Sequence, residues 1–174
     1  IILRNNGLHI EMIINSCGTI GSQDLAGIDD IQIESAMSTI MDFEDSIAAV
    51  DGDDKVEAYT NWLGLVTGSL KSEFTKNGKT LTRKLSDDKV YTGRNGDDYT
   101  LHGRSLLMIR NVGHLMGIDL MTDQEGNEVP EGIMDAIVTS LIGSIAIKNS
   151  SACRVSNSRT GSIYIVKPKM HGPE

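Results

Sequence analysis

Three short apolar runs constrain the fold of this chain more than any other feature. Each run is closed by charged or polar residues, and they read ESAMSTIMDFEDS at 34–46, RSLLMIRNVGH at 104–114 and GSIYIVKPKMHG at 161–172. Short apolar runs of this kind are typical of parallel strands buried on both faces. We therefore expect a parallel α/β arrangement.

A helix is expected between the second and third runs, within NEVPEGIMDAIVTSLIGSIAIK at 127–148. Pro130 falls in its first turn, where a missing N–H does no harm. An apolar face at helical spacing is formed by Ile133, Ala136, Ile137, Leu141 and Ile145. Strand, helix and strand in this order favour parallel strands joined by a crossover helix.

Two other regions break this pattern. Residues 68–103 are polar, contain the hairpin signals Asn77-Gly78 and Asn95-Gly96, and alternate like strands in KTLTRKL and DDYTLHG. We interpret them as a β-rich insertion. The first 35 residues are ambiguous, because GLHIEMIIN at 7–15 alternates like a strand, whereas IDDIQIESAMSTI fits a helix from Ile28 with two aspartates in its first turn.

Composition excludes several classes of protein. The net charge is −8 and no lysine or arginine cluster offsets it, which argues against a nucleic-acid-binding face. No apolar run of 18 residues and no signal peptide pattern is present, so we expect no membrane span. Cys17 and Cys153 lack CxxC spacing, which argues against a disulfide framework or thiolate zinc site and favours reduced thiols in a cytosol-like compartment.

The chain starts without methionine and stops at KMHGPE, so we expect an internal piece of a longer protein.

Candidate functional residues stand where the apolar runs end, because parallel α/β proteins collect functional side chains at these ends. Asp42 and Glu44 are two residues apart, so in extended backbone both point to one side and Asp45 points the other way. Paired carboxylates suit a divalent cation or the water molecules that it binds. Arg110 closes the second run, where a guanidinium can stabilise an enolate or alkoxide oxygen.

Each feature also has a purely structural interpretation. Asp51, Asp53 and Asp54 are expected to be loop and helix-capping charges, and Arg110 to be an ordinary ion-pair partner if nothing else supports it. Lys167 and Lys169 flank Pro168 where the third strand is expected to end, and they add positive charge there.

Two histidines carry no clear role at this stage. His114 is interpreted as a satisfied loop or core histidine, and His9 has no partner at ligand spacing. Glycine-rich nucleotide motifs are absent.

Six blocks give the sequence a specific likeness. They read NNGLHIEM, TIMDFEDSIAAVDGDDKVEAYTNWLGL, GKTLTRKL, GRSLLMIRNVGHLM, NEVPEGIMD and NSRTGSIYIVKPKMHGPE. In this order they resemble the malate synthases, specifically the long single-chain isoform G. That family has a TIM barrel with an N-terminal helical clasp, an inserted β-rich domain and a C-terminal helical plug.

The resemblance implies a domain plan and an activity. Residues 1–35 would belong to the inserted domain, 36–67 to the barrel, 68–103 again to the insertion, and 104–174 to the barrel. The implied fold is therefore α/β, with part of a TIM (β/α)8 barrel interleaved with a β-rich subdomain. The parent would be a monomeric cytoplasmic enzyme of the glyoxylate cycle that uses Mg²⁺ to join acetyl-CoA to glyoxylate, giving malate and CoA.

Roles for individual residues also come from the resemblance. Arg110 matches the arginine that contacts glyoxylate and steadies the acetyl-CoA enolate. Asp42 and Glu44 match acids that hold water molecules of the magnesium shell. Ser46 and Arg83 match positions that contact the coenzyme.

The resemblance also implies what these residues lack. The family's direct magnesium ligands and its catalytic aspartate have no counterpart in the 174 residues, so we expect the isolated chain to be inactive and to bind Mg²⁺ weakly or not at all. Departures from the family fall at 117–126 and 148–159, both expected to be loops. A related Mg²⁺-dependent acyl-CoA lyase of the citrate-lyase β-subunit type, and a non-catalytic folded subdomain, are the alternatives.

Overall fold

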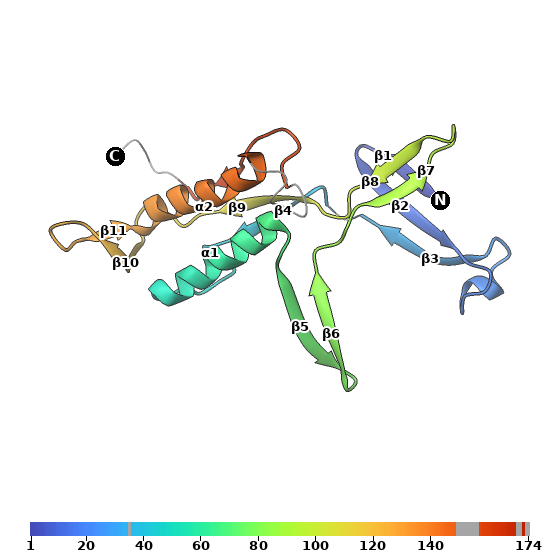
Figure 1. Cartoon of the computed structure of the whole chain (residues 1–174), viewed down its shortest axis with the longest axis horizontal. Coiled ribbons are helices and arrows are strands. Elements are labelled where there is room, and N and C mark those ends of the chain that lie inside the picture. Colours follow the sequence, from blue (N-terminus) through green and yellow to red (C-terminus); the bar gives the residue numbers. More distant parts are fainter. Residues whose placement is uncertain (35, 149–156, 170–171, 173–174) are drawn as a thin grey trace. The chain divides into compact units, whose positions relative to one another are not determined.

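The structure is a computed structural model that describes residues 1–34, 36–148, 157–169 and 172 (Figure 1). The chain divides into two compact units, Ile1–Thr39 and Ile40–Glu174. The four-segment division at 35, 67 and 103 stays a prediction. Cys17 is an exposed free thiol, whereas Cys153 lies outside the described residues.

The first unit is built around an antiparallel sheet of order β1-β2-β3, with β1 at Ile2–Asn5, β2 at Leu8–Ile14 and β3 at Ile28–Ile33. The predicted strand within 7–15 is confirmed as β2. The predicted helix from Ile28 is wrong, because this segment pairs along β2 as a strand. Asp29 accepts hydrogen bonds from the amides of Ile20 and Gly21, beside the short 3-10 helix η1 (Gly21–Gln23), and caps no α-helix.

The three apolar runs form one sheet of order β12-β9-β4, and all of it except the first two residues of β4 lies in the second unit. Its strands are β4 (Ser38–Asp42), β9 (Leu106–Arg110) and β12 (Ile165–Val166). β9 and β12 are parallel, as predicted, with Ile109 opposite Ile165. The described residues contain both helices and strands, and their strands do not close into a barrel.

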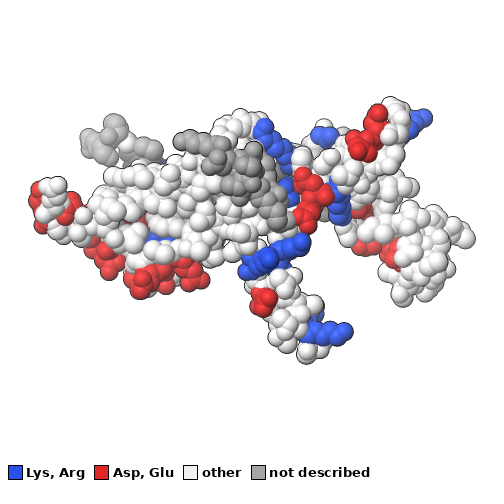
Figure 2. Space-filling view, viewed as in Figure 1, with Lys and Arg blue, Asp and Glu red and all other residues white. Residues whose placement is uncertain are grey.

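Two helices pack against this sheet, α1 (Gly52–Thr67) and α2 (Glu131–Lys148). Asp51 is the N-cap of α1 and accepts from the Asp54 amide at 3.0 Å, while Asp54 accepts from the Val50 amide at 3.1 Å. These two contacts confirm the helix-start interpretation of Asp51 and Asp54. Figure 2 shows acidic side chains over the start of α1. Neither these helices nor any other described one is long and apolar enough to cross a membrane.

Both predicted hairpins are confirmed. β5 (Lys71–Lys76) and β6 (Lys79–Lys84) are joined by Asn77 and Gly78, whose φ angles of 52° and 73° fit a two-residue turn that needs positive φ at both positions. β7 (Lys89–Thr92) and β8 (Asp98–Leu101) enclose the predicted Asn95-Gly96 turn, with φ 86° at Gly96.

The predicted loop at 117–126 is wrong. Residues Gly117–Thr122 form β10, which pairs with β11 (Glu128–Pro130). The turn between them is organised by Asp123, which accepts hydrogen bonds from the amides of Glu125 and Asn127. Pro130 ends β11 immediately before α2, so it does not lie in the first turn of the helix. Residues 149–156, most of the other predicted loop, lie outside the described part of the chain.

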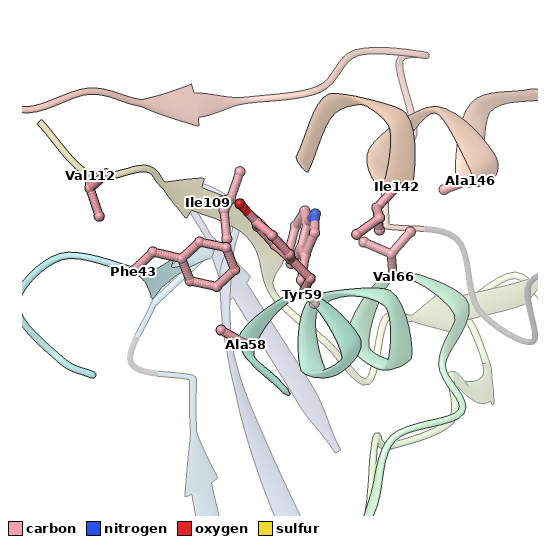
Figure 3. Close-up of a cluster of buried hydrophobic side chains, with 9 residues drawn as sticks. Phe43, Ala58, Tyr59, Val66, Ile109, Val112, Ile142 and Ala146 are labelled. Atoms are coloured by element: carbon pink, nitrogen blue, oxygen red, sulfur yellow. The ribbon is translucent and has the colours of Figure 1, made fainter. Parts of the chain in front are cut away.

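The apolar face predicted for α2 points the wrong way. Ile133, Ile137 and Leu141 are 51%, 62% and 66% exposed, and Ala136 is exposed as well. The core instead receives the other side of the helix, including Ile142 and Ala146. Figure 3 shows Ile142 next to Val66 of α1, with Ala146 further along α2. Apolar residues occur on both sides of α2, so apolar spacing alone does not select the face that meets the core.

What selects the face is a buried charged group, which we name the Lys55 cluster: Lys55, Tyr59, Glu131 and Asp135. The Lys55 ammonium is fully buried and lies 2.6 Å from Glu131 and 2.9 Å from Asp135. Tyr59 donates to Asp135 at 2.8 Å. Burial, then the two nearby carboxylates, raises the pKa of Tyr59 far above its usual range, which keeps the phenol protonated as a donor.

The Lys55 cluster generates a stability prediction. Lys55→Met should lower the free energy of unfolding by about 3–5 kcal/mol, because it leaves two buried carboxylates without their cation. Lys84→Met is the matched control: its ion pair with Asp87 is 3.3 Å long and over half exposed, so the change should stay within about 1 kcal/mol. Urea unfolding of both variants measures the difference, and equal effects would contradict the assignment.

Candidate functional site

The ends of β4 and β9 lie side by side. The amide of Phe43, directly after β4, donates to the carbonyl oxygen of Arg110, the last residue of β9, at 2.9 Å. Asp42 and Arg110, the last residues of their strands, therefore lie at the same end of the sheet. The side chain of Phe43 turns into the core, where it is 2% exposed, and this fixes the outward direction of its neighbour Asp42.

Arg110 and Asp42 form a bidentate pair. Arg110 Nε lies 2.8 Å from Asp42 Oδ1, and Nη2 lies 2.6 Å from Oδ2. Two parallel charge-assisted hydrogen bonds fix the plane of a guanidinium, so Arg110 cannot rotate freely. The Asp42 side chain is 12% exposed and that of Arg110 is 26% exposed, which places the pair at the boundary of core and solvent.

The chain bends directly after the pair, and this bend overturns one prediction. Asp42 accepts from the amide of Glu44 at 2.9 Å and from the hydroxyl of Ser46 at 3.0 Å, so residues 43–46 curl around its carboxylate. The prediction that Asp45 points away is therefore wrong, because it assumed extended backbone. Asp45 instead accepts from Arg110 Nη2 at 2.6 Å.

The charges of the site hold one another in the ionised state. The Arg110 guanidinium, assisted by the Glu44 amide and the Ser46 hydroxyl, holds the pKa of Asp42 well below its usual range against the opposing effect of burial. In return Asp42, followed by Asp45, raises the pKa of Arg110 above its usual range. Asp42 is thus a permanent anion near neutral pH, suited to orient a cation and unsuited to remove a proton.

Two groups of the site keep capacity for a ligand. Among described residues no hydrogen bond uses Arg110 Nη1, and its two N–H groups can meet an oxygen ligand. Glu44 lies 3.9 Å from Arg110 Nε, beyond hydrogen-bond distance, with its side chain 29% exposed. The described side chains include no cluster of three or more His, Cys, Asp or Glu arranged to hold a metal ion.

The structure unites four of the five predicted site residues: Asp42, Glu44, Ser46 and Arg110. Arg83 does not join them by any described contact; it lies on exposed β6, with its guanidinium carbon 4.7 Å from the centre of the Phe74 ring. Of the two lysines that flank Pro168, Lys167 donates to the Val112 carbonyl at 2.6 Å. His114 is exposed, and His9 pairs with Glu34 at 2.6 Å.

Sequence reasoning missed the Lys55 cluster, which lies behind the site. A signal was present: Glu131, Asp135 and Thr139 recur every four residues in an otherwise apolar helix. Polar residues at that spacing share one helix face. The buried polar face of α2 could therefore have been found from the sequence.

The fold and this site together define an α/β protein with a charged site, made of one arginine and several carboxylates, where β4 and β9 end. The model of "Malate synthase, TIM barrel domain" matches residues 106–174. Over the whole chain, malate synthase G of Halalkalibacterium halodurans is 54% identical. Malate synthase G of Corynebacterium glutamicum and that of Corynebacterium efficiens are each 56% identical, also over the whole chain.

These matches run over the whole chain and agree with the resemblance to malate synthase G that the sequence blocks indicated. The chain spans 24%, 23% and 23% of the length of these three relatives, in the same order.

The Asp42 pair generates a pH prediction. Because the folded pKa of Asp42 lies below its unfolded value, its contribution to stability is present above about pH 4 and is lost as the pH falls toward the folded value. Asp42→Asn should therefore flatten the loss of stability between about pH 5 and pH 2. Urea unfolding at a series of pH values measures this, and parallel curves for both proteins would refute the pairing.

Proposed function

We propose that the full-length protein containing this sequence is a malate synthase, which condenses acetyl-CoA with glyoxylate and water to give malate and CoA. The single observation that carries the proposal is the held arginine: Asp42 fixes Arg110 in two hydrogen bonds while Nη1 stays available to an oxygen ligand. A malate synthase needs such a group, because negative charge develops on an enolate oxygen and then on the aldehyde oxygen.

The chemistry divides between these residues and the rest of the protein. Condensation requires a base that takes a methyl proton from acetyl-CoA, after which the enolate carbon attacks the glyoxylate aldehyde and water cleaves the thioester. The lowered pKa of Asp42 makes it a poor base, so we assign proton removal to a carboxylate elsewhere in the protein. Arg110 then holds glyoxylate and the enolate oxygen in register.

Magnesium is part of the proposal, and the residues fit an indirect role. Both oxygens of Asp42 are engaged by Arg110, and of the three acids beside Arg110 only Glu44 has a carboxylate that no described hydrogen bond uses. We therefore propose that Asp42 and Glu44 hold water molecules bound to Mg²⁺ and do not bind the ion directly. The ion supplies Lewis-acid polarisation of the aldehyde when bound.

The remaining assignments rest on the family resemblance. Ser46, beside Asp42, and Arg83, on exposed β6, are proposed to contact acetyl-CoA. We also propose a monomer in the cytoplasm, with no nucleic acid or membrane partner. The lyase alternative is not favoured, because the relatives matched over the whole chain are malate synthases. The chain by itself is proposed to be inactive.

The proposed role of Arg110 is tested by Arg110→Lys in the full-length protein. A lysine keeps the charge but loses the bidentate geometry with Asp42, so turnover should fall on the order of 10²-fold or more. Glyoxylate-dependent release of CoA is the measurement. Arg94→Lys, in the exposed turn between β7 and β8, is the matched control and should keep its turnover. Near-normal turnover of Arg110→Lys would remove the arginine from catalysis.

The proposed role of Asp42 is tested by its effect on the metal. Asp42→Asn should raise the Mg²⁺ concentration needed for half-maximal activity by about 10 to 100-fold, as loss of an indirect metal partner does. It should also lower turnover at saturating Mg²⁺. Asparagine has only one acceptor atom, so it cannot form both hydrogen bonds that Asp42 accepts from Arg110. An unchanged magnesium requirement would contradict the water-holding role.

A further inference from the structure

Asp135 contacts the backbone just beyond Arg110. Its Oδ2 accepts from the Val112 amide at 2.9 Å, and both the Asp135 and Asn111 side chains are fully buried. Asn111 is held by the same helix, since its side-chain amide donates to Thr139 Oγ1 at 3.2 Å. Both residues that follow Arg110 are therefore tied to α2 through side chains one turn apart.

The other oxygen of Asp135 is held by α1. Oδ1 lies 2.9 Å from the Lys55 ammonium and 2.8 Å from the Tyr59 hydroxyl. One buried carboxylate thus joins three elements: α2, which carries it, α1, and the end of β9. In a close-packed interior its position is fixed by these donors, and the backbone of Val112 is fixed with it.

The same cluster reaches the end of β4. The Lys55 ammonium lies 4.9 Å from the centre of the Phe43 ring, and the ring of Tyr59 meets that ring edge to face at 5.7 Å. Figure 3 shows Phe43, Tyr59 and Val112 on the inner side of the sheet end. Phe43 follows Asp42 directly, and its amide binds the Arg110 carbonyl. The Lys55 cluster therefore touches both strand ends that carry the ion pair.

We propose that Asp135 is a positioning residue for Arg110: by holding Val112 against α1 and α2, it sets where the end of β9 lies relative to β4, and so keeps the guanidinium in register with Asp42. Asp135 touches no reacting group. A shift of about 1 Å at a strand end is enough to misplace a bidentate pair and to lower turnover strongly. The activity part of this inference rests on the proposed function, whereas the structural part does not.

The sharpest variant is Asp135→Asn, which keeps the size of the side chain. The Lys55 ammonium and the Val112 N–H can only donate, and they face opposite atoms of the carboxylate. An amide offers one acceptor and one donor, so in either orientation a donor meets a donor. Oδ1 receives two donors, one of them charged, so the amide oxygen should take that place and the NH2 should face the Val112 N–H. The expected result is an opening of the Val112 contact, with little change of volume.

The experiment compares Asp135→Asn with Trp62→Phe in the full-length protein. Trp62 is 1% exposed in the same helix interface and donates to the Thr139 carbonyl at 3.3 Å, so its loss weakens that interface without removing a donor or acceptor from Val112. Three quantities are measured: the melting temperature, hydrogen exchange of the peptide that contains Val112, and kcat and KM for each substrate.

If Asp135 positions Arg110, the two variants should change different quantities. Asp135→Asn should speed exchange at Val112 by about tenfold or more and lower kcat by about 10 to 100-fold, with KM for acetyl-CoA within about twofold of the parent value. Trp62→Phe should lower the melting temperature but keep both Val112 protection and kcat. If both variants lose kcat in proportion to melting temperature, Asp135 is merely structural and the proposal fails.

The test still holds if Asp135→Asn fails to fold or if the parent protein makes no malate. If Asp135→Asn does not fold, Asp135→Glu replaces it, because the longer acid keeps the charge on Lys55 but displaces the carboxylate from Val112; the same separation is expected, and normal kcat overturns the proposal. If the parent protein makes no malate, the proposed function fails, and Val112 exchange alone then decides whether Asp135 holds the strand end. Unchanged exchange at Val112 sinks the inference in every case.

Discussion

The contact between Lys55 and Asp135 is the constraint on which the second unit depends. A fully buried ammonium is tolerated only where carboxylates meet it, and here Glu131 and Asp135 do so at 2.6 and 2.9 Å. Since the lysine comes from α1 and both acids from α2, the two helices cannot slide without separating buried charges. The face of α2 that meets the core is chosen by this requirement, against the more apolar stripe at Ile133, Ile137 and Leu141.

The acids near the strand ends divide into two groups with different environments. Asp135 is buried, and its carboxylate accepts hydrogen bonds from Tyr59 of α1 and from Val112 just beyond β9, so its proposed role is to position the backbone. Asp42, Glu44 and Asp45 lie at the solvent side around a single guanidinium, which leaves a surplus of negative charge. In the proposed function a hydrated cation would balance this surplus, and Arg110 Nη1 would be left for an oxygen of the substrate. The proposed reaction uses both properties.

Much of the secondary structure could be read from local pattern. The apolar runs became β4, β9 and β12, and the Asn-Gly pairs became hairpin turns, because both signals depend on neighbours in sequence. The segment from Ile28 failed because its pairing along β2 is a contact with another strand, which overrode a helix-like start. The hairpin of β10 and β11 was missed because its turn is made by the side chain of Asp123.

For the site, the sequence by itself determined which residues stand at the strand ends, and the family resemblance added the roles expected of Asp42, Glu44, Ser46 and Arg110. Only the tertiary structure decided that Asp45 turns back onto Arg110, that Arg83 stands apart among the described contacts, and that Asp135 holds Val112. The physical reason is that strand ends are set by local composition, whereas an ion pair depends on distances between segments far apart in the chain. Asp42 and Arg110 are 68 residues apart and meet only because β4 and β9 are neighbours in the sheet.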